Sequence, residues 1–317
     1  MTKKELRIIY MGTPEFAVAP LQSLVEQGFN IVAVITMPDK PQGRGRKISG
    51  SPVKEFAVEH NIPVLQPEKL KNPEFIEELK SYKADLQIVV AFRMLPEIVW
   101  NMPKYGTFNL HAALLPQYRG AAPINWAIIN GETKTGVTTF LLDKDIDTGR
   151  ILMRQEIEIL DSDNIGTLYD KLMEIGQGLV VKTVEKIIAG DTNPIPQEEL
   201  IDKQTVLKPA PKIFKEDCRL EFNKPCNSVR NLVRGLSPYP AAFTTLNVNG
   251  KTLTAKIFET STEISNSKLE PGKILTDNKS YLKIVCNDGF LIINELQLEG
   301  KKRMKIQDFL RGVKIDC

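Results

Sequence analysis

Short apolar runs alternate with helix-like segments along the first half of the chain. Continuous apolar runs of strand length are typical of strands that are buried on both faces of a sheet. They occupy residues 6–11, 31–36, 86–91 and 107–110. Because these runs alternate with helical segments, the pattern predicts an α/β domain with a mostly parallel sheet.

Amphipathic segments between the predicted strands indicate where helices form. After the first strand, Thr13 is expected to cap a helix that has Pro14 at its first position and ends at Gly28. This strand-helix-strand unit is expected to cross over with the right hand. A second helix is expected over residues 52–60, and a long helix over residues 165–188. The long helix is expected to turn these side chains inward: Leu168, Leu172, Ile175, Leu179 and Val180.

The pattern changes in the second half of the chain. Residues 191–211 are rich in Pro, Gln, Glu and Lys with little periodicity, which is typical of a linker. Alternating apolar and polar residues, separated by the turn signals Asn249-Gly250 and Asp288-Gly289, then predict strands over 242–248, 251–259, 281–285 and 289–296. We therefore expect one domain over residues 1–190, a linker over 191–211 and a small β-barrel over 212–317.

Composition agrees with a globular protein of two domains. The chain has 317 residues, of which 42% are hydrophobic and 26% charged. Neither a membrane-spanning apolar window nor a signal-peptide pattern is present, so we expect a cytoplasmic protein. The four cysteines show no metal-ligand spacing, so we expect no metal site and no disulfide framework. A net charge of +3 does not by itself indicate a nucleic-acid partner.

Histidine is the usual general base at neutral pH, and the chain has two of them. His60 ends a polar helix, where a solvated surface position is expected. His111 lies at the carboxyl end of a predicted strand, which is where open α/β sheets bind their ligands. Alternation along that strand points Asn109 to the same side as His111. The alternative for His111 is a hydrogen-bonded structural role beside a turn.

Three aspartates alternate at Asp143, Asp145 and Asp147. A calcium loop of the EF-hand type is excluded, because its sixth and twelfth positions would be Thr148 and Arg154 in place of Gly and an acid. Asp147 precedes a turn and is interpreted as a carboxylate that orients and charge-stabilises a histidine from a neighbouring strand. Asp143 and Asp145 are interpreted as solvated loop charges.

A basic loop follows the second predicted strand. It has neither P-loop nor dinucleotide-binding spacing, and its charges are Lys40, Arg44, Arg46 and Lys47. A flexible basic loop beside a sheet edge suits contact with a nucleic-acid backbone, although solvated surface explains many charge runs of this size. Both interpretations of the loop stay open on residue pattern alone.

Taken together, several motifs closely resemble the methionyl-tRNA formyltransferase family. They are residues 12–16, the basic loop, residues 109–116, residues 118–123 and residues 147–149. The resemblance extends over essentially the whole chain. It implies a Rossmann-like formyltransferase domain followed by an OB-like β-barrel domain that binds tRNA. It also implies a monomeric, cytoplasmic enzyme that moves the formyl group of 10-formyltetrahydrofolate onto the amine of methionyl-initiator tRNA.

The resemblance also assigns residues to roles. It implies a catalytic set of Asn109, His111 and Asp147, which identifies folate-dependent formyl transfer but not the acceptor. In the tRNA enzymes of the family, the basic loop contacts the acceptor stem of the tRNA. The matching residues here are Lys40, Arg44, Arg46 and Lys47, and they indicate tRNA as the acceptor. The barrel would add backbone contacts through Lys251, Lys301, Lys302 and Arg303. The implied folate-binding residues are Phe92, Arg93, Ala113, Leu114, Leu115 and Pro116.

Two departures from the family pattern affect the folate site. Ala113 stands where the family usually has Ser, so a hydroxyl contact is lost, and the loop over residues 92–96 is shorter than the common form. The nearest rivals are a formyltransferase for an amino-sugar nucleotide and a formylfolate hydrolase or dehydrogenase domain, which would use the same catalytic set. A catalytically silent tRNA-binding module is the alternative from another class. The basic loop argues against the first two, and the complete catalytic set argues against the third.

Overall fold

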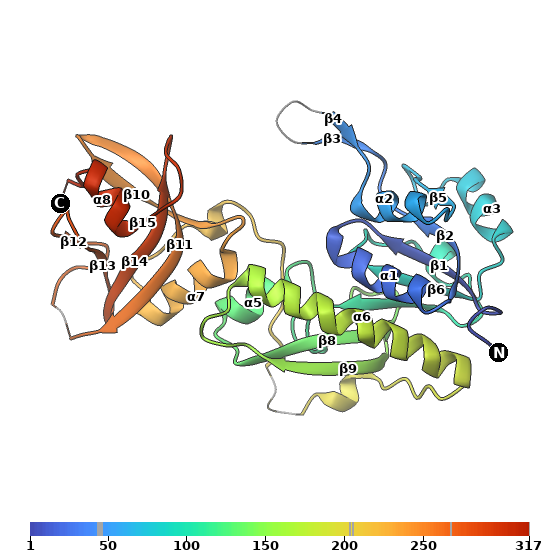
Figure 1. Ribbon diagram of the computed structural model, residues 1–317. Coiled ribbons are helices and arrows are strands. Elements are labelled where there is room, and N and C mark those ends of the chain that lie inside the picture. The colour runs from blue at the N-terminus through green and yellow to red at the C-terminus, as the bar shows by residue number, and fades with distance from the viewer. Residues whose placement is uncertain (43–46, 203, 205, 267, 317) are drawn as a thin grey trace. The chain divides into compact units, whose positions relative to one another are not determined.

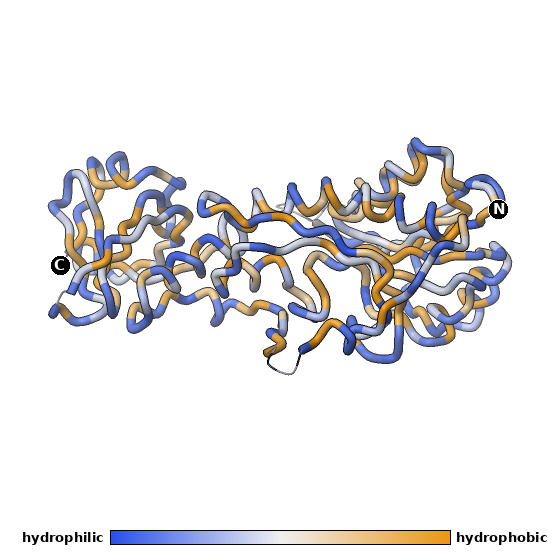
Figure 2. Tube along the Cα trace, turned by 90° about the horizontal axis from the view of Figure 1, so that it is seen from below, coloured by the Kyte–Doolittle hydropathy of each residue, from blue (hydrophilic) through white to orange (hydrophobic). Residues whose placement is uncertain are grey.

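The computed structural model describes residues 1–42, 47–202, 204, 206–266 and 268–316, with the backbone alone at residues 41, 42, 47 and 48. The chain divides into two compact units (Figure 1). The first consists of Met1–Gly120, Gly136–Ile157 and Lys171–Pro209. The second consists of Ala121–Thr135, Glu158–Asp170 and Ala210–Cys317. Within each unit, apolar and hydrophilic stretches alternate along the chain (Figure 2).

A seven-stranded sheet dominates the first unit, with the strand order β5-β2-β1-β6-β7-β8-β9 (Figure 1). Its strands are β1 (Arg7–Gly12), β2 (Asn30–Ile35), β5 (Val64–Leu65), β6 (Leu86–Val90), β7 (Thr107–His111), β8 (Lys134–Leu141) and β9 (Ile151–Glu158). The pairs β1-β2, β1-β6, β2-β5 and β6-β7 are parallel, whereas β7 and β8 are antiparallel. The predicted mostly parallel α/β sheet is confirmed.

Helices cover this sheet because inner strands such as β1 and β6 are buried on both faces. The helical segments are η1 (Glu15–Ala17), α1 (Val18–Glu26), α2 (Pro52–Glu59), α3 (Pro73–Ser81), α4 (Glu97–Trp100), α6 (Ile165–Ala189) and η2 (Gln197–Leu200). Side chains of β1 alternate between the faces. Ile9 and Met11 join a core cluster with apolar residues of α3 and α4. Tyr10, between them, is fully buried and donates its hydroxyl to the Ala17 carbonyl at 2.6 Å.

The first helix begins later than its sequence pattern predicts. Thr13 was expected as its cap and Pro14 as its first residue, but Pro14 is extended and the α-helix starts at Val18, after the 3-10 turn η1. The reason is Pro20, which lacks a backbone N–H. In a helix that began at Pro14 this proline would interrupt the interior, whereas in α1 it lies in the first turn, where no intrahelical donor is needed. Gly28, at φ +76°, follows the helix end as expected.

An antiparallel sheet forms a half-barrel in the second unit, with the order β10-β11-β14-β13-β12 and β15 added to β14 (Figure 1). Its strands are β10 (Ala242–Val248), β11 (Lys251–Ile264), β12 (Ile274–Thr276), β13 (Leu282–Cys286), β14 (Gly289–Leu298) and β15 (Met304–Lys305). Asn249 and Gly250 have positive φ and form the predicted turn between β10 and β11. The prediction of a small β domain after the α/β domain is confirmed.

Helices pack against this half-barrel and close its core. The remaining helical segments are α5 (Pro123–Ile129), η3 (Glu216–Cys218), α7 (Cys226–Leu236) and α8 (Ile306–Gly312). Val229 and Val233 of α7 and Phe309 of α8 are buried in one core cluster with apolar residues of the strands. Cys218, Cys226 and Cys286 are buried free thiols. Among the described residues, no helix combines the length and the apolarity needed to cross a bilayer.

Candidate active site

The end of β7 carries the predicted acid-base histidine. His111 is the last residue of this strand, which lies between the parallel strand β6 and the antiparallel strand β8. Asn109 precedes it by two residues, so strand alternation directs both side chains to the same face. Asn109 is partly exposed, and its amide has no hydrogen-bond partner among the described residues. The Asn109 amide and the His111 imidazole therefore lie on the same face of β7, near its carboxyl end.

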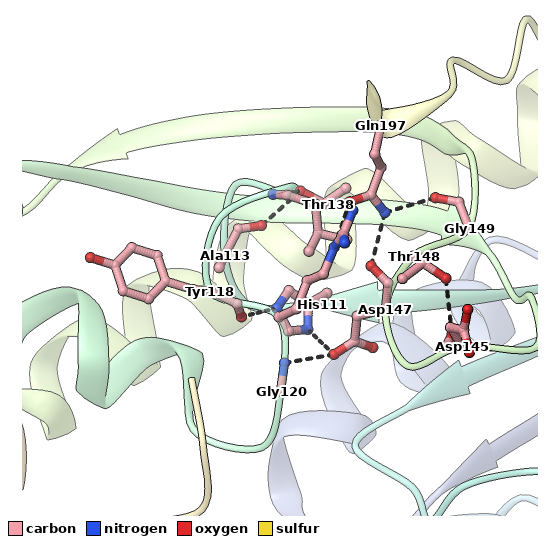
Figure 3. Close-up of polar contacts among 12 residues, drawn as sticks. His111, Ala113, Tyr118, Gly120, Thr138, Asp145, Asp147, Thr148, Gly149 and Gln197 are labelled. Carbon is pink, nitrogen blue, oxygen red and sulfur yellow. Dashed lines mark hydrogen bonds and ion pairs between the residues drawn. The ribbon is translucent and has the colours of Figure 1, made fainter. Parts of the chain in front are cut away.

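The His111 imidazole is held between two oxygen acceptors (Figure 3). Its Nε2 lies 2.9 Å from the Tyr118 carbonyl oxygen, and its Nδ1 lies 3.8 Å from Oδ2 of Asp147. The side chain is 6% exposed, and the ring of Phe140 packs edge-on against it. The structure thus brings together His111 and Asp147, which the sequence places 36 positions apart.

The two acceptors decide which nitrogen of His111 is available. A backbone carbonyl can only accept, so Nε2 carries the hydrogen that is donated to Tyr118. In the neutral ring, Nδ1 is then the basic nitrogen, and it faces Asp147. Burial lowers the pKa of His111, while the charge of Asp147 and the Tyr118 hydrogen bond act in the opposite direction. His111 is therefore neutral at pH 7 and has a basic nitrogen beside a carboxylate that stabilises the protonated ring.

Asp147 is fixed by its backbone as well as by its side chain. Its φ of +56° lies in the left-handed region, which Asp tolerates better than most residues. Oδ2 accepts a hydrogen bond from the Gly120 N–H at 2.9 Å, and the side chain is 14% exposed (Figure 3). The loop between β8 and β9 therefore presents this carboxylate to His111 in one defined orientation. Asp143 and Asp145, in the same loop, are exposed, as expected for solvated charges.

Gln197 joins the site from a segment distant in sequence (Figure 3). Its Nε2 donates to the carbonyls of Asp147 at 2.9 Å and Gly149 at 2.8 Å. Its Oε1 accepts from Nε and Nη2 of Arg119, at 3.1 Å and 2.7 Å. Gln197 is completely buried. A polar network of Arg119 and Gln197 thus supports the backbone of the loop that carries Asp147.

The predicted folate-binding stretch after His111 is tied to β8 through its backbone. The Ala113 carbonyl accepts from the Thr138 hydroxyl at 2.7 Å, and that hydroxyl in turn accepts from the Leu115 N–H at 3.2 Å. The Leu115 side chain is fully buried against Phe140 and Ile151. Pro116 follows it through a cis peptide bond and is also buried, whereas Leu114 and Ala112 are partly exposed. Ala113 and Leu115 are completely buried, main chain included, so Leu114 is the most accessible residue of the stretch 113–116.

Phe92 and Arg93, the other predicted folate-binding residues, follow β6. The Arg93 guanidinium donates to the carbonyls of Glu68, at 2.8 Å, and Pro67. Burial lowers the pKa of Arg93. Phe92 is partly buried against the core on the α3 side of the sheet. Among the described contacts, neither residue touches His111 or Asp147, so the structure does not join them to the pair.

Two of the predicted tRNA-binding residues belong to a short hairpin: Lys40 begins β3 (Lys40–Gln42) and Lys47 begins β4 (Lys47–Ser49). Lys40 is exposed. Arg44 and Arg46 lie outside the described residues, and Lys47 is described by its backbone alone. His60 is exposed, as predicted, and stacks on Phe56 at the end of α2.

Two family models match the chain. The formyl transferase model matches residues 6–184, and the model of the formyl transferase C-terminal domain matches residues 212–314. Methionyl-tRNA formyltransferase of Bacteroides fragilis (strain YCH46) is 58% identical over 313 residues, which cover 98% of this chain and 96% of that protein. The chain belongs to the methionyl-tRNA formyltransferase family. Another relative, methionyl-tRNA formyltransferase of Flavobacterium johnsoniae, is 49% identical and covers 98% of this chain and 97% of its own length.

Solved structures share the fold of this member of the methionyl-tRNA formyltransferase family. An N-formyltransferase from Helicobacter canadensis, in complex with folinic acid and dTDP-3-aminofucose, has a TM-score of 0.66 at 20% identity. The match covers 94% of this chain and all of that one. HypX from Aquifex aeolicus, in complex with tetrahydrofolic acid, has a TM-score of 0.62 at 21% identity, covering 99% of this chain and 49% of its own.

Sequence reasoning missed the support of the site in this methionyl-tRNA formyltransferase family member. Gln197 falls in the segment interpreted as a linker, and no role was predicted for it or for the Arg119 side chain. Residues 191–211 contain three amide side chains, Asn193, Gln197 and Gln204, and nothing in the sequence around them marks Gln197 as the buried one. Within the described residues, no group of three His, Cys, Asp or Glu side chains is placed to hold a metal ion.

Proposed function

We propose that this protein transfers the formyl group of 10-formyltetrahydrofolate to the α-amine of methionine carried by initiator tRNA. The observation that carries the proposal is the His111–Asp147 pair, held at the end of β7 with Asn109 two residues before it. Its geometry provides a neutral base, a stabilising carboxylate and a nearby amide donor. The full-length likeness to methionyl-tRNA formyltransferases supports the acceptor. The reaction serves initiation of translation in the cytoplasm.

Asn109 is proposed as the group that stabilises the oxyanion. When the amine attacks the formyl carbon, the carbonyl oxygen becomes negative and needs a hydrogen-bond donor. The Asn109 amide is partly exposed and uncommitted to other described residues, so its NH₂ can point at this oxygen. A donor that is already in place requires no reorganisation when the charge develops.

His111 is proposed to manage the proton of the attacking amine. The amine loses a proton as its bond to the formyl carbon forms, and N10 of the folate gains one as its bond to the same carbon breaks. Nδ1 of His111 is the basic nitrogen, and it accepts the proton because Asp147, 3.8 Å away, stabilises the resulting imidazolium. Asp147 thus acts through His111, and the hydrogen bond of Nε2 to Tyr118 keeps the ring oriented.

Other residues are proposed to bind the two substrates. Folate binding is assigned to Phe92, Arg93, Ala113, Leu114, Leu115 and Pro116. Of the last four, Leu114 is partly exposed and is assigned the direct contact, whereas Ala113, Leu115 and Pro116 are buried and set the course of the stretch. The tRNA backbone is proposed to contact the basic loop at Lys40, Arg44, Arg46 and Lys47. Further contacts are assigned to a tRNA-binding domain over residues 212–317.

The decisive experiment compares acceptors. Purified protein is incubated with 10-formyltetrahydrofolate and methionyl-initiator tRNA, and the aminoacyl group is analysed by mass spectrometry for an added formyl group. Parallel reactions contain an amino-sugar nucleotide or no acceptor, and release of tetrahydrofolate is followed in all of them. We expect formylation of the methionyl-tRNA and no turnover in the other two reactions. Equal folate turnover without any acceptor would identify a hydrolase and refute the proposal.

A further inference from the structure

Gln197 uses the entire hydrogen-bonding capacity of its side chain inside the first unit. Its amide has two N–H donors and an oxygen with two lone pairs. The donors are satisfied by the carbonyls of Asp147 and Gly149 (Figure 3), and the oxygen by two N–H groups of Arg119. Gln197 itself is completely buried, so its amide is shielded from competing water.

The partners of Gln197 leave a single way to place its amide. The Arg119 guanidinium has only donors, so it requires the oxygen of the amide. Two main-chain carbonyls have only lone pairs, so they require the NH₂ group. An amide rotated by 180° would set donors against donors and acceptors against acceptors at four contacts. Arg119 therefore determines that Gln197 presents its NH₂ group to the loop that carries Asp147.

This loop has few other connections near its tip. Its ends are tied to the sheet, by Leu142 N–H to the Thr107 carbonyl at 2.8 Å and by Leu141 N–H to the Arg150 carbonyl at 2.9 Å. Between these ends, the described bonds of Lys144 and Thr148 stay inside the loop. The stretch that carries Asp147 is linked to the rest of the unit by Gly120 and by Gln197.

The backbone that Gln197 holds is one that needs external support. Asp147 has a φ of +56°, which is less favourable for a residue with a side chain than the ordinary right-handed regions. Gly149 lies so close to β8 that an added Cβ would come within 1.7 Å of the Leu141 carbonyl oxygen. Gln197 bonds the main chain of both residues, and therefore spans the turn that sets the direction of the Asp147 carboxylate.

We propose that Gln197, oriented by Arg119, is a positioning residue that fixes the Asp147 carboxylate against His111. This inference rests on the proposed function, because it assigns a role in that site. Loss of the Gln197 amide should let the turn relax and move the carboxylate away from Nδ1. The reaction should then lose stabilisation of the imidazolium, while the residues assigned to folate stay in place.

The test combines kinetics with a titration that needs no substrate. Gln197→Met keeps the length of the side chain and removes all four hydrogen bonds without adding charge. Gln197→Asn retains an amide that is one methylene too short to keep them, and serves if the first variant does not fold. Glu198→Gln, at the exposed neighbouring position, is the matched control. The chain has two histidines, so imidazole Cε1–H NMR signals report His111 directly, with His60→Ala giving the assignment.

Three results are expected. The Gln197 variants should lower kcat by up to ~10²-fold, as for misplacement of a catalytic group by about 1 Å, with the KM for the formyl donor unchanged. Their His111 pKa should fall below that of the wild type, in the same direction as in Asp147→Asn, because the stabilising carboxylate has moved. Gln197→Met combined with Asp147→Asn should be no slower than Asp147→Asn alone.

An unchanged His111 titration in a folded Gln197 variant would overturn the inference, as would losses that multiply in the double variant. Those results would reduce Gln197 to a buried structural residue. If the wild-type protein does not formylate methionyl-tRNA, the proposed function fails. The titration still tests the position of Asp147 in that case, so the two failures can be told apart.

Discussion

Removal of the Asp147 charge tests the proposed site most directly. Asp147→Asn is the suitable change because Asn tolerates the left-handed backbone at φ +56°, so the turn is preserved while the charge is lost. The Gly120 N–H can still donate to the side-chain oxygen of Asn. The variant therefore separates the electrostatic role of the carboxylate from the structural role of the loop.

The expected size of the effect follows from the 3.8 Å between Nδ1 of His111 and Oδ2 of Asp147. Two unit charges at that distance attract by ~1 kcal/mol in bulk water and by ~4 kcal/mol at an effective dielectric constant of about 20. Since ~1.4 kcal/mol corresponds to a factor of ten in rate, the loss of kcat lies between about 5-fold and about 10³-fold. Both side chains are largely buried, which places the effect in the upper part of this range.

The assay is steady-state formylation of methionyl-tRNA across pH, with mass spectrometry of the product. We expect kcat to fall while the KM for 10-formyltetrahydrofolate is unchanged. Asp143→Asn and Asp145→Asn are matched controls, because both residues are exposed in the same loop and neither contacts His111 in the described structure. If Asp147→Asn retains half of the wild-type kcat, or if all three variants lose activity equally, the orienting role of Asp147 is wrong.

Three further predictions address the amide donor, the titration of His111 and the basic loop. Asn109→Ala should lower kcat on the order of 10²–10³-fold, because the donor to the oxyanion is lost. The control is His60→Ala, at an exposed position, which should leave kcat unchanged; equal kinetics for the two variants would refute the oxyanion role of Asn109. Because burial lowers the pKa of His111, the unfolded state binds more protons below the ordinary value of 6.5. As the pH falls through that value, the wild type should therefore lose more folding stability than a His111→Gln variant. Urea denaturation of both proteins at several pH values measures this, and parallel curves of stability against pH would contradict it. The basic loop is neutralised by replacing Lys40, Arg44, Arg46 and Lys47. This change should weaken tRNA binding, measured by gel shift, and flatten the slope of log affinity against log salt by about 0.7–0.9 per charge. An unchanged slope would make this loop solvated surface.

Strands buried on both faces were the elements most readily predicted from sequence. β1, β2, β6 and β7 lie within about one residue of their predicted bounds, because a run of apolar residues between turn signals has few other interpretations. β8 was missed, although it is largely buried. Its Thr138 and Thr139 are buried polar residues, and their hydroxyls bond the Ala113 carbonyl and Thr183. A buried strand whose polar groups are satisfied by distant partners does not show an apolar pattern.

The candidate site, too, could be predicted from sequence only in part. That His111 lies at a strand end could be inferred locally, and its neighbourhood with Asp147 was expected from the turn that follows Asp147. Gln197 could not be inferred, because its role depends on two carbonyls and a guanidinium brought together by tertiary structure. The assignment of folate and tRNA contacts stays a prediction, as do the domain boundaries.

The left-handed backbone at Asp147 also limits which sequences can occupy this position. Asn and Gly adopt that conformation readily, but neither carries a negative charge. Glu carries the charge, but its longer side chain lacks the local hydrogen bonding that helps Asp in this region of φ and ψ, and its carboxylate would extend past the Gly120 N–H. The backbone requirement and the charge requirement overlap at Asp alone. Selection for activity in a saturated library of position 147 should therefore return the parental residue, even though replacements by Asn, Gly and Glu are each one nucleotide change away.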